Sequence, residues 1–238
     1  MSDIPNASAN SADFEFAALS EARNYRAALI AAFQAHLRGS VLEVGAGIGQ
    51  ITEALASLTT VQRLLSVEPD ASFCSAFRAR LPHAELLHGT VEDLQGDSSW
   101  NAIVSINVLE HIEKDNQELA AYHRLLRKYA GTLCLFVPAR PELYAPIDRD
   151  FGHFRRYRKR ELELKLAECG FKCQRIRYYN LLGYFAWWAN FCLLKRRSFD
   201  VASVRLFDRV LFPAGHFLET HVSTPPLGQS LLVIATAR

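Results

Sequence analysis

Short apolar runs alternate with stretches of helical spacing along the first half of the chain. The apolar runs predict five strands, and between them apolar positions recur every three to four residues, as on one face of a helix. The predicted strands lie at Val41–Val44, Leu64–Val67, the start of Leu86–Leu94, the start of Asn101–Ile112, and Thr132–Val137. The predicted helices span 14–37, 51–58, 71–80 and 116–128. This alternation indicates an α/β fold with a parallel sheet and helices on both faces, whose ligands bind at the carboxyl ends of the strands.

The pattern breaks after the fifth predicted strand. Residues 138–157 contain three prolines, several aromatic side chains and charges of both signs, which predicts a lid or substrate loop over the strand ends. We then expect a helix at Lys159–Glu168, a strand at Phe171–Tyr179, a mostly helical, aromatic insertion at 180–217, and a last strand at Gln229–Ala237. No internal repeat or low-complexity linker interrupts the sequence, so a single domain over residues 1–238 is predicted.

Three glycines, Gly45, Gly47 and Gly49, follow the first strand directly and precede a helical pattern. Glycine permits positive φ and lets a ligand approach the backbone closely, because it has no Cβ. Turns that bind dinucleotides usually have the spacing Gly-x-Gly-x-x-Gly, and here the third glycine comes one residue early. Glu43 in the strand would repel a pyrophosphate, but it suits a ligand with an ammonium group. S-adenosylmethionine (SAM) has an ammonium group and no phosphate.

Composition narrows the class of protein only a little. Of 238 residues, 50% are hydrophobic and 22% are charged, which is typical of globular proteins, and the net charge of +2 argues neither for nor against a nucleic-acid partner. The five cysteines form no Cys-x-x-Cys pair, which fits free thiols in a reducing cytoplasm. Residues 1–12 are polar and lack a signal-peptide pattern, so we expect a disordered leader there.

Polar residues also follow the next strands. Glu68 comes at the end of the second strand, where a carboxylate can accept hydrogen bonds from both ribose hydroxyls of a nucleoside. A polar turn at Gly89–Leu94 follows the third strand, and Asn107–Ile112, with the sequence Asn-Val-Leu-Glu-His-Ile, follows the fourth. With these features in this order, the chain resembles the class I SAM-dependent methyltransferases from about Asn24 to the C-terminus. It is most similar to the bacterial small-molecule subgroup with Val-Leu-Glu-His-Ile and Gly-His-x-Arg-Arg-Tyr motifs.

The resemblance implies a Rossmann-like, seven-stranded, mostly parallel sheet whose last strand is antiparallel and follows the helical insertion. It implies SAM as cofactor and S-adenosylhomocysteine as product. Thr90 departs from the family pattern, since many relatives have Asp there, which shifts the expected adenine contact to Val91 and Glu92. The cofactor-binding residues that we predict are Tyr25, Glu43, Gly45, Ala46, Gly47, Gly49, Glu68, Pro69, Thr90, Val91, Glu92, Asn107 and Val108.

Candidate catalytic residues are His111, His153 and Tyr157, because a histidine that titrates near neutral pH is the usual general base. His111 could equally well pack beneath the site and bond to backbone. A metal is not expected, because the Glu110-His111 pair has no partner at ligand spacing. The predicted substrate-binding residues are Tyr144, Asp148, Arg156 and Tyr184.

Two segments allow more than one interpretation. The basic run Arg155–Arg160 fits a substrate loop, a solvated helix start or, less well, a nucleic-acid patch. The apolar segment Leu181–Leu194 is too short to span a membrane, and we favour a core or a substrate wall over contact with a membrane surface.

The sequence thus favours a cytoplasmic methyltransferase that transfers a methyl group to O, N or C of a small molecule. The alternatives are an RNA methyltransferase, a non-catalytic SAM-binding module and, against the glycine spacing, a nicotinamide-dependent oxidoreductase. The oligomeric state stays open.

Overall fold

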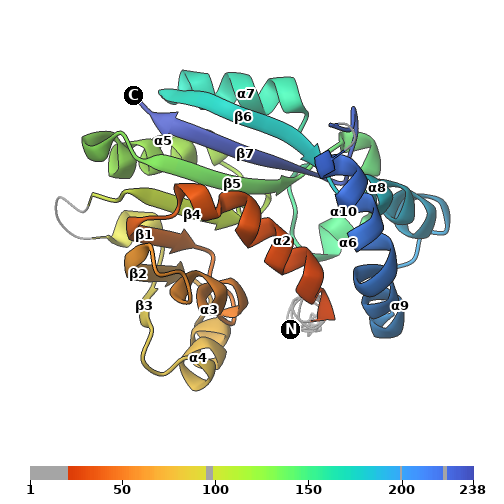
Figure 1. The fold of residues 1–238 in the computed structure, drawn as a ribbon, viewed down its shortest axis with the longest axis horizontal. Coiled ribbons are helices and arrows are strands. Elements are labelled where there is room, and N and C mark those ends of the chain that lie inside the picture. Colours follow the sequence, from red (N-terminus) through yellow and green to blue (C-terminus); the bar gives the residue numbers. More distant parts are fainter. Residues whose placement is uncertain (1–20, 95–98, 199, 222–223) are drawn as a thin grey trace, which may run out of the picture.

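The structure is a computed structural model that describes residues 21–94, 99–198, 200–221 and 224–238. Its centre is a seven-stranded sheet with the order β3-β2-β1-β4-β5-β7-β6 (Figure 1). The strands are β1 (Gly39–Val44), β2 (Val61–Glu68), β3 (Glu85–His88), β4 (Ala102–Ile106), β5 (Thr132–Pro138), β6 (Phe171–Tyr179) and β7 (Ser230–Ala237). Strands β1 to β5 pair in parallel, whereas β7 runs antiparallel to both β5 and β6. This topology confirms the predicted Rossmann-like fold and its antiparallel last strand.

Helices cover both faces of the sheet, because successive side chains of each central strand point to opposite faces. In β5, Leu133 and Leu135 belong to a core with α5 (Asp115–Leu126) and α7 (Lys159–Glu168). Cys134 and Phe136 belong to a second core with α2 (Arg23–Phe33), α3 (Gln50–Ala56) and part of α10 (Phe212–His221). The near-continuous apolar runs of these strands therefore follow from burial on both sides.

The predicted element boundaries agree with the structure over most of the described chain. Helix α4 (Ala71–Arg80) has the predicted bounds, and its N-cap Asp70 accepts hydrogen bonds from two backbone N–H groups. Strand β2 begins three residues earlier than predicted, because its exposed first half contains Gln62 and Arg63 and has no apolar run to mark it. Of the helix predicted over 14–37, only the part from α2 to a 3₁₀ turn at Gln34–His36 lies within the described residues. The predicted leader, 1–12, lies outside them.

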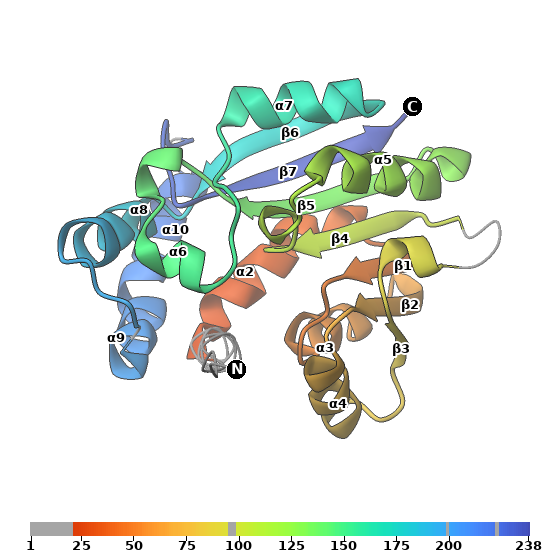
Figure 2. The same cartoon turned by 180° about the vertical axis from the view of Figure 1, so that it is seen from behind.

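The segment after β5 is more regular than a loop. It contains a 3₁₀ turn at Pro141–Leu143 and the short helix α6 (Pro146–Asp150), each with a proline in its first turn. The predicted helical insertion comprises α8 (Leu181–Trp187), a π-helical turn (Trp188–Leu193), α9 (Val201–Leu206), a second π-helical turn (Phe207–Leu211) and α10. It continues to His221, four residues beyond the predicted end. Figure 2 shows α6 beside α8, and Ile147 packs against Trp187 and Phe191 there.

Candidate active site

The glycine turn between β1 and α3 is shaped largely by the protein's own packing. Gly45 and Gly49 have φ values of 76° and 84°, a region that residues with a side chain rarely adopt. A Cβ on Gly45 would also lie 2.2 Å from a methyl carbon of Val108, and one on Gly49 would lie 3.0 Å from Phe77. These two glycines are therefore required even without a ligand. The sequence analysis explained the three glycines mainly by the close approach of a cofactor.

Glu43 lies beneath this turn and is fully buried in β1. One of its carboxylate oxygens accepts hydrogen bonds from the hydroxyls of Thr52, at 2.6 Å, and Ser66, at 2.7 Å. Burial raises the pKa of Glu43 to about 7, although the two hydroxyl donors counteract it. A carboxyl group with this pKa gains or loses its charge according to what binds near it, so it can respond to a cationic ligand at the turn.

Glu68 ends β2 and connects it to the glycine turn. Its carboxylate accepts hydrogen bonds from the backbone N–H groups of Gly47, at 2.7 Å, and Asp70, at 3.0 Å. Burial raises the pKa of Glu68, while these two N–H donors act in the opposite direction. Each oxygen can accept a further hydrogen bond, so the arrangement fits the predicted ribose diol.

The turn after β3 is built around Thr90. Its hydroxyl oxygen accepts a hydrogen bond from the N–H of Glu92, and its own N–H donates to Asp93, which starts a 3₁₀ turn at Val91–Asp93. The side chain of Val91 is buried, whereas Glu92 and Pro69 are exposed. Contacts of these residues with an adenine therefore stay a prediction.

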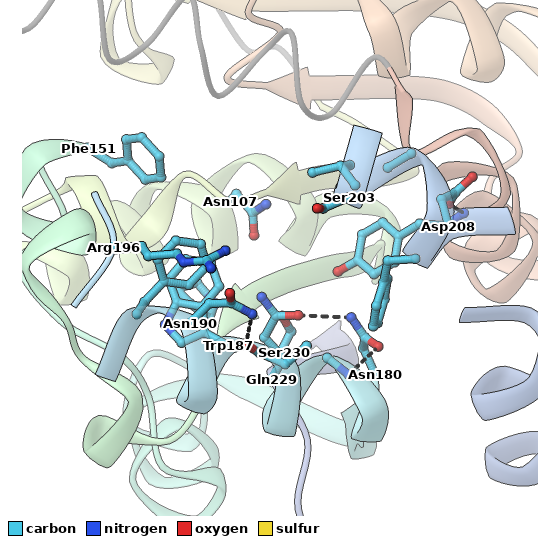
Figure 3. A pocket seen from close by; sticks show the side chains of 18 of the residues that line it. Asn107, Phe151, Asn180, Trp187, Asn190, Arg196, Ser203, Asp208, Gln229 and Ser230 are labelled. Atoms are coloured by element: carbon cyan, nitrogen blue, oxygen red, sulfur yellow. Dashed lines mark hydrogen bonds between the residues drawn. The ribbon is translucent and has the colours of Figure 1, made fainter. Parts of the chain in front are cut away.

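A cavity of about 280 Å³ lies at the carboxyl ends of β4 and β5, under the helical insertion (Figure 3). Asn107, directly after β4, faces it with a φ of 52°, and Tyr25 of α2 forms part of its wall. Asp208 positions Tyr25 by accepting hydrogen bonds from the N–H groups of Asn24 and Tyr25. Other residues of the wall are Glu110, Pro138, Phe151, His153, Arg156, Asn180, Trp187, Asn190, Phe191, Arg196, Ser203, Phe207, Gln229 and Ser230.

His153 is a cavity residue whose orientation is set by a buried carboxylate. Asp148 is completely buried and lies 3.1 Å from Nδ1 of His153 and 2.8 Å from Nε of Arg156. Burial alone would raise the pKa of Asp148, but His153 and the charge of Arg156 hold it below its ordinary value. Arg156 stacks its guanidinium over Trp187, 4.4 Å from the ring centroid. Asp148 thus acts on the cavity through His153 and Arg156, and its predicted direct contact with a substrate stays a prediction.

His111 lies next to His153, with the two ring centroids 4.6 Å apart in an edge-on contact. Burial and the neighbouring His153 lower the pKa of His111 to about 4, although a hydrogen bond with the backbone of Phe151 counteracts them. Ligand atoms of Glu110, His111 and His153 lie within 4.8 Å of one another. The sequence argument against a metal, that Glu110-His111 has no partner at ligand spacing, is therefore incomplete, because the fold brings His153 there from the segment after β5.

Three predicted tyrosines do not belong to the cavity wall. The hydroxyl of Tyr157 is buried and donates to the carbonyl oxygen of Leu109 or to Asp115, both at 3.1 Å, and burial raises its pKa. The hydroxyl of Tyr144 donates to the carbonyl oxygen of His153 at 2.7 Å, which supports the loop of that histidine. The ring of Tyr184 lies beneath the guanidinium of Arg140. These contacts give each of the three side chains a structural role, and their predicted roles toward a substrate stay predictions.

Sequence reasoning found Asn107 but missed the other amide side chains of the wall, which are Asn180, Asn190 and Gln229. Asn180 caps α8 by accepting a hydrogen bond from the N–H of Gly183, and its side-chain N–H donates to Gln229 at 2.8 Å. Its φ of 62° is one that asparagine tolerates better than most residues. An asparagine directly before an apolar helical run was the available signal for this cap.

Comparison with known proteins agrees with this geometry. Residues 41–129 match a family of methyltransferase domains. This part of the chain, which includes the glycine turn, Glu43 and Glu68, is thus similar to known methyltransferase domains. A probable SAM-dependent methyltransferase of Mycolicibacterium smegmatis is 27% identical over 137 residues, which are 56% of this chain and 52% of the relative. The chain thus matches about half the length of this relative.

Solved structures of low sequence identity share the fold. The N-methyltransferase NodS of Bradyrhizobium japonicum, in complex with S-adenosylhomocysteine, has a TM-score of 0.57 at 13% identity, and the match covers 90% of this chain and 86% of that one. A complex from Haloferax volcanii between the Trm112 methyltransferase activator and a methyltransferase matches with a TM-score of 0.64 at 16% identity and 99% coverage of both chains. These matches confirm the methyltransferase fold. Together with the domain match they support the predicted enzyme class and SAM as its cofactor, and the predicted subgroup with its two motifs stays a prediction.

Proposed function

We propose that the chain transfers a methyl group from SAM to a small molecule held in the cavity under the helical insertion. The observation that carries this proposal is the position of the cavity at the carboxyl ends of β4 and β5, where Asn107 and Pro138 line it, in a chain whose residues 41–129 are similar to methyltransferase domains. Its volume of about 280 Å³ is suited to a small acceptor. Trp187, Phe191 and Phe207 supply an apolar wall, and Asn180, Asn190 and Gln229 supply hydrogen-bonding groups.

The residues present fit the cofactor. Bound SAM would supply a methyl group on a sulfonium; the acceptor would attack the methyl carbon in line, and S-adenosylhomocysteine would leave. Glu68 would accept hydrogen bonds from the ribose, the backbone at Gly47 would face the ligand, and Glu43 would favour its ammonium group. The main task of the protein is then to hold the acceptor in line and to exclude water.

His153 is the group that we assign to the acceptor. It lies in the cavity wall, and the Asp148 carboxylate can hold the proton on Nδ1, which leaves Nε2 as the basic atom. It would take the proton of an acceptor hydroxyl or amine as the methyl group is transferred. His111 is the weaker candidate base, because its pKa of about 4 makes it a poor proton acceptor at neutral pH.

Two measurements test this proposal. Calorimetry should show binding of S-adenosylhomocysteine and no binding of NAD, and the reverse result would contradict the cofactor assignment. SAM with a labelled methyl group should then label the low-mass fraction of a bacterial extract and not its RNA. Label in RNA would favour the RNA methyltransferase, and label in neither fraction, with normal cofactor binding, would favour a non-catalytic module.

Substitution of His153 separates acceptor chemistry from cofactor binding. We expect His153→Ala to lower turnover about 10²-fold or more, since a general base contributes roughly 10²–10⁴. Affinity for S-adenosylhomocysteine should change by less than about 0.5 kcal/mol, because the lost interaction involves only the acceptor. His83→Ala, at an exposed histidine between α4 and β3, is the matched control. Full activity of His153→Ala would remove His153 from the mechanism.

A further inference from the structure

Large exposed apolar side chains are concentrated in the helical insertion. Twelve such residues are exposed within the described part of the chain, and nine of them lie between residues 185 and 218. They are Phe185, Trp188, Leu193, Leu194, Leu206, Val210, Leu211, Phe217 and Leu218. A concentration of this kind marks a surface that another apolar phase covers, because single exposed apolar residues are normally scattered.

The run from α9 through the second π-helical turn to α10 is apolar on two opposite faces. Its buried face includes Phe212 and Gly215, which pack towards α2 and α8. Its exposed face includes Leu206, Val210 and Phe217, each more than half exposed. Only the first face is needed for packing within the chain, so folding does not account for the second. Figure 1 shows α8, α9 and α10 together at one end of the molecule, beyond the ends of the strands.

The charges of the insertion are of one dominant sign. Residues 181–221 contain five basic residues, Lys195, Arg196, Arg197, Arg205 and Arg209, all of them exposed. Of the three acidic residues there, Asp208 and Glu219 are buried and accept hydrogen bonds from backbone N–H groups of Tyr25 and Asn180. Arg197 and Arg205 pair with Asp150 and Glu21, and Asp200 is exposed, so Lys195, Arg196 and Arg209 are the cations that give this apolar surface its basic rim. An apolar face with a basic rim is complementary to an anionic lipid surface, where apolar side chains enter the acyl boundary and cations meet the head groups.

We propose that the helical insertion binds the surface of an anionic lipid membrane. Within the described residues, no helix is long and apolar enough to cross a bilayer, so the contact would be peripheral. Ser203, Val204 and Phe207 of the same helices line the cavity, so binding would bring the cavity wall to the membrane surface. The binding itself does not depend on the proposed methyl transfer, and it can be tested without an acceptor.

Vesicle sedimentation tests this inference with the full chain. Vesicles of phosphatidylglycerol and phosphatidylcholine should retain the protein at low salt, and pure phosphatidylcholine vesicles should retain at least tenfold less. The triple variant Leu206→Glu, Val210→Glu, Phe217→Glu should lose at least tenfold in partitioning, and Lys195→Glu with Arg209→Glu should lose the preference for anionic lipid. None of these residues lines the cavity.

Leu164→Glu on α7 is the matched control, because Leu164 is 55% exposed and Val210 is 56% exposed. It should bind vesicles as the unaltered chain does. Unchanged affinity for S-adenosylhomocysteine in every variant would show that each is folded. Equal retention by the two kinds of vesicle would overturn the inference. So would self-association in free solution that the triple variant abolishes, since a second copy would then be the occupant. A chain that neither binds vesicles nor self-associates would overturn it as well.

Discussion

The half of the sheet around β1 to β3 and the enclosure built from α6 and the helical insertion are held together in different ways. Around the glycine turn, each key contact joins neighbouring strands and their following turns, as when Glu68 accepts the N–H of Gly47. Around the cavity, several contacts join segments far apart in the chain. Asp208 holds the start of α2 across 183 positions, and Glu219 holds Asn180 across 39.

The family match covers residues 41–129, which include the glycine turn, and it ends before α6 and the helical insertion. Local strand–turn–helix units repeat the same backbone geometry wherever a cofactor of the same kind binds. The cavity wall requires only that a few distant side chains meet, and many different insertions can achieve that. We therefore expect substitutions around the glycine turn to act through backbone strain or altered charge. Substitutions around the cavity should act through loss of buried ion pairs.

The largest effect is expected at Asp148. Asp148→Ala leaves the Arg156 guanidinium buried without its carboxylate, and removal of one partner of a buried pair costs about 3–5 kcal/mol. Urea unfolding should show a corresponding loss in the free energy of unfolding. Asp148→Asn, which can still accept a hydrogen bond, should lose less.

Asp150 offers the matched control. It lies two positions after Asp148 on the same helix and pairs with the exposed Arg197. Exposed ion pairs contribute little to stability, so Asp150→Ala should be close to the unaltered chain. Equal stability of the two alanine variants would show that the buried pair does not hold the cavity wall.

Gly45 tests the region around the glycine turn. Gly45→Ala forces a side chain into a φ of 76° and against Val108, and we expect a loss of about 2–4 kcal/mol in the free energy of unfolding from the combined strain and overpacking. Adding Val108→Ala removes the steric part and leaves the backbone strain, so the double variant should recover about half of the loss. If Gly45→Ala is as stable as the unaltered chain, the turn is held less tightly than its contacts imply.

The sequence was sufficient to predict the helices, strands and residue positions that follow from local patterns. The bounds of α7 and β6 agree with the prediction residue for residue, because alternation of apolar and polar positions and the helix-ending Gly170 mark them. The positions of Glu43, Glu68 and Asn107 at strand ends follow from the same patterns. The meeting of His153 with Asp148, and of Glu110 with His111 and His153, could not be predicted, because no spacing in the chain records which way the segment after β5 folds back. The hydrogen bond of Tyr157 with Asp115 could not be predicted for the same reason, since its neighbours in the chain do not show which way its hydroxyl turns.

Glu43 predicts a pH dependence of cofactor binding. Its pKa of about 7 in the free chain lies above the ordinary value, so it is largely protonated at pH 6 and largely ionised at pH 8. A ligand ammonium group favours the ionised form, and affinity for S-adenosylhomocysteine should therefore rise by up to about tenfold from pH 6 to pH 8. Glu43→Gln should flatten this profile, as calorimetry at several pH values would show. A slope that persists in Glu43→Gln would belong to another group.

The smallest effect is expected from removal of divalent cations. Glu110, His111 and His153 contain a donor set that binds zinc in other proteins, and their ligand atoms lie within 4.8 Å of one another. Bond lengths of about 2.1 Å place the ligands of a tetrahedral ion roughly 3.4 Å apart, so any of these atoms that lie farther apart would have to move closer to bind one. A metal present at 100 times its dissociation constant would stabilise the chain by about 2.7 kcal/mol, which a thermal melt detects easily. We expect the melts with excess chelator and with excess Zn²⁺ or Mn²⁺ to coincide, because His153 then acts as a base and not as a ligand. Stabilisation by the cation that is lost in His111→Ala would instead make these three residues a metal centre, and would transfer the activation of the acceptor from His153 to the ion.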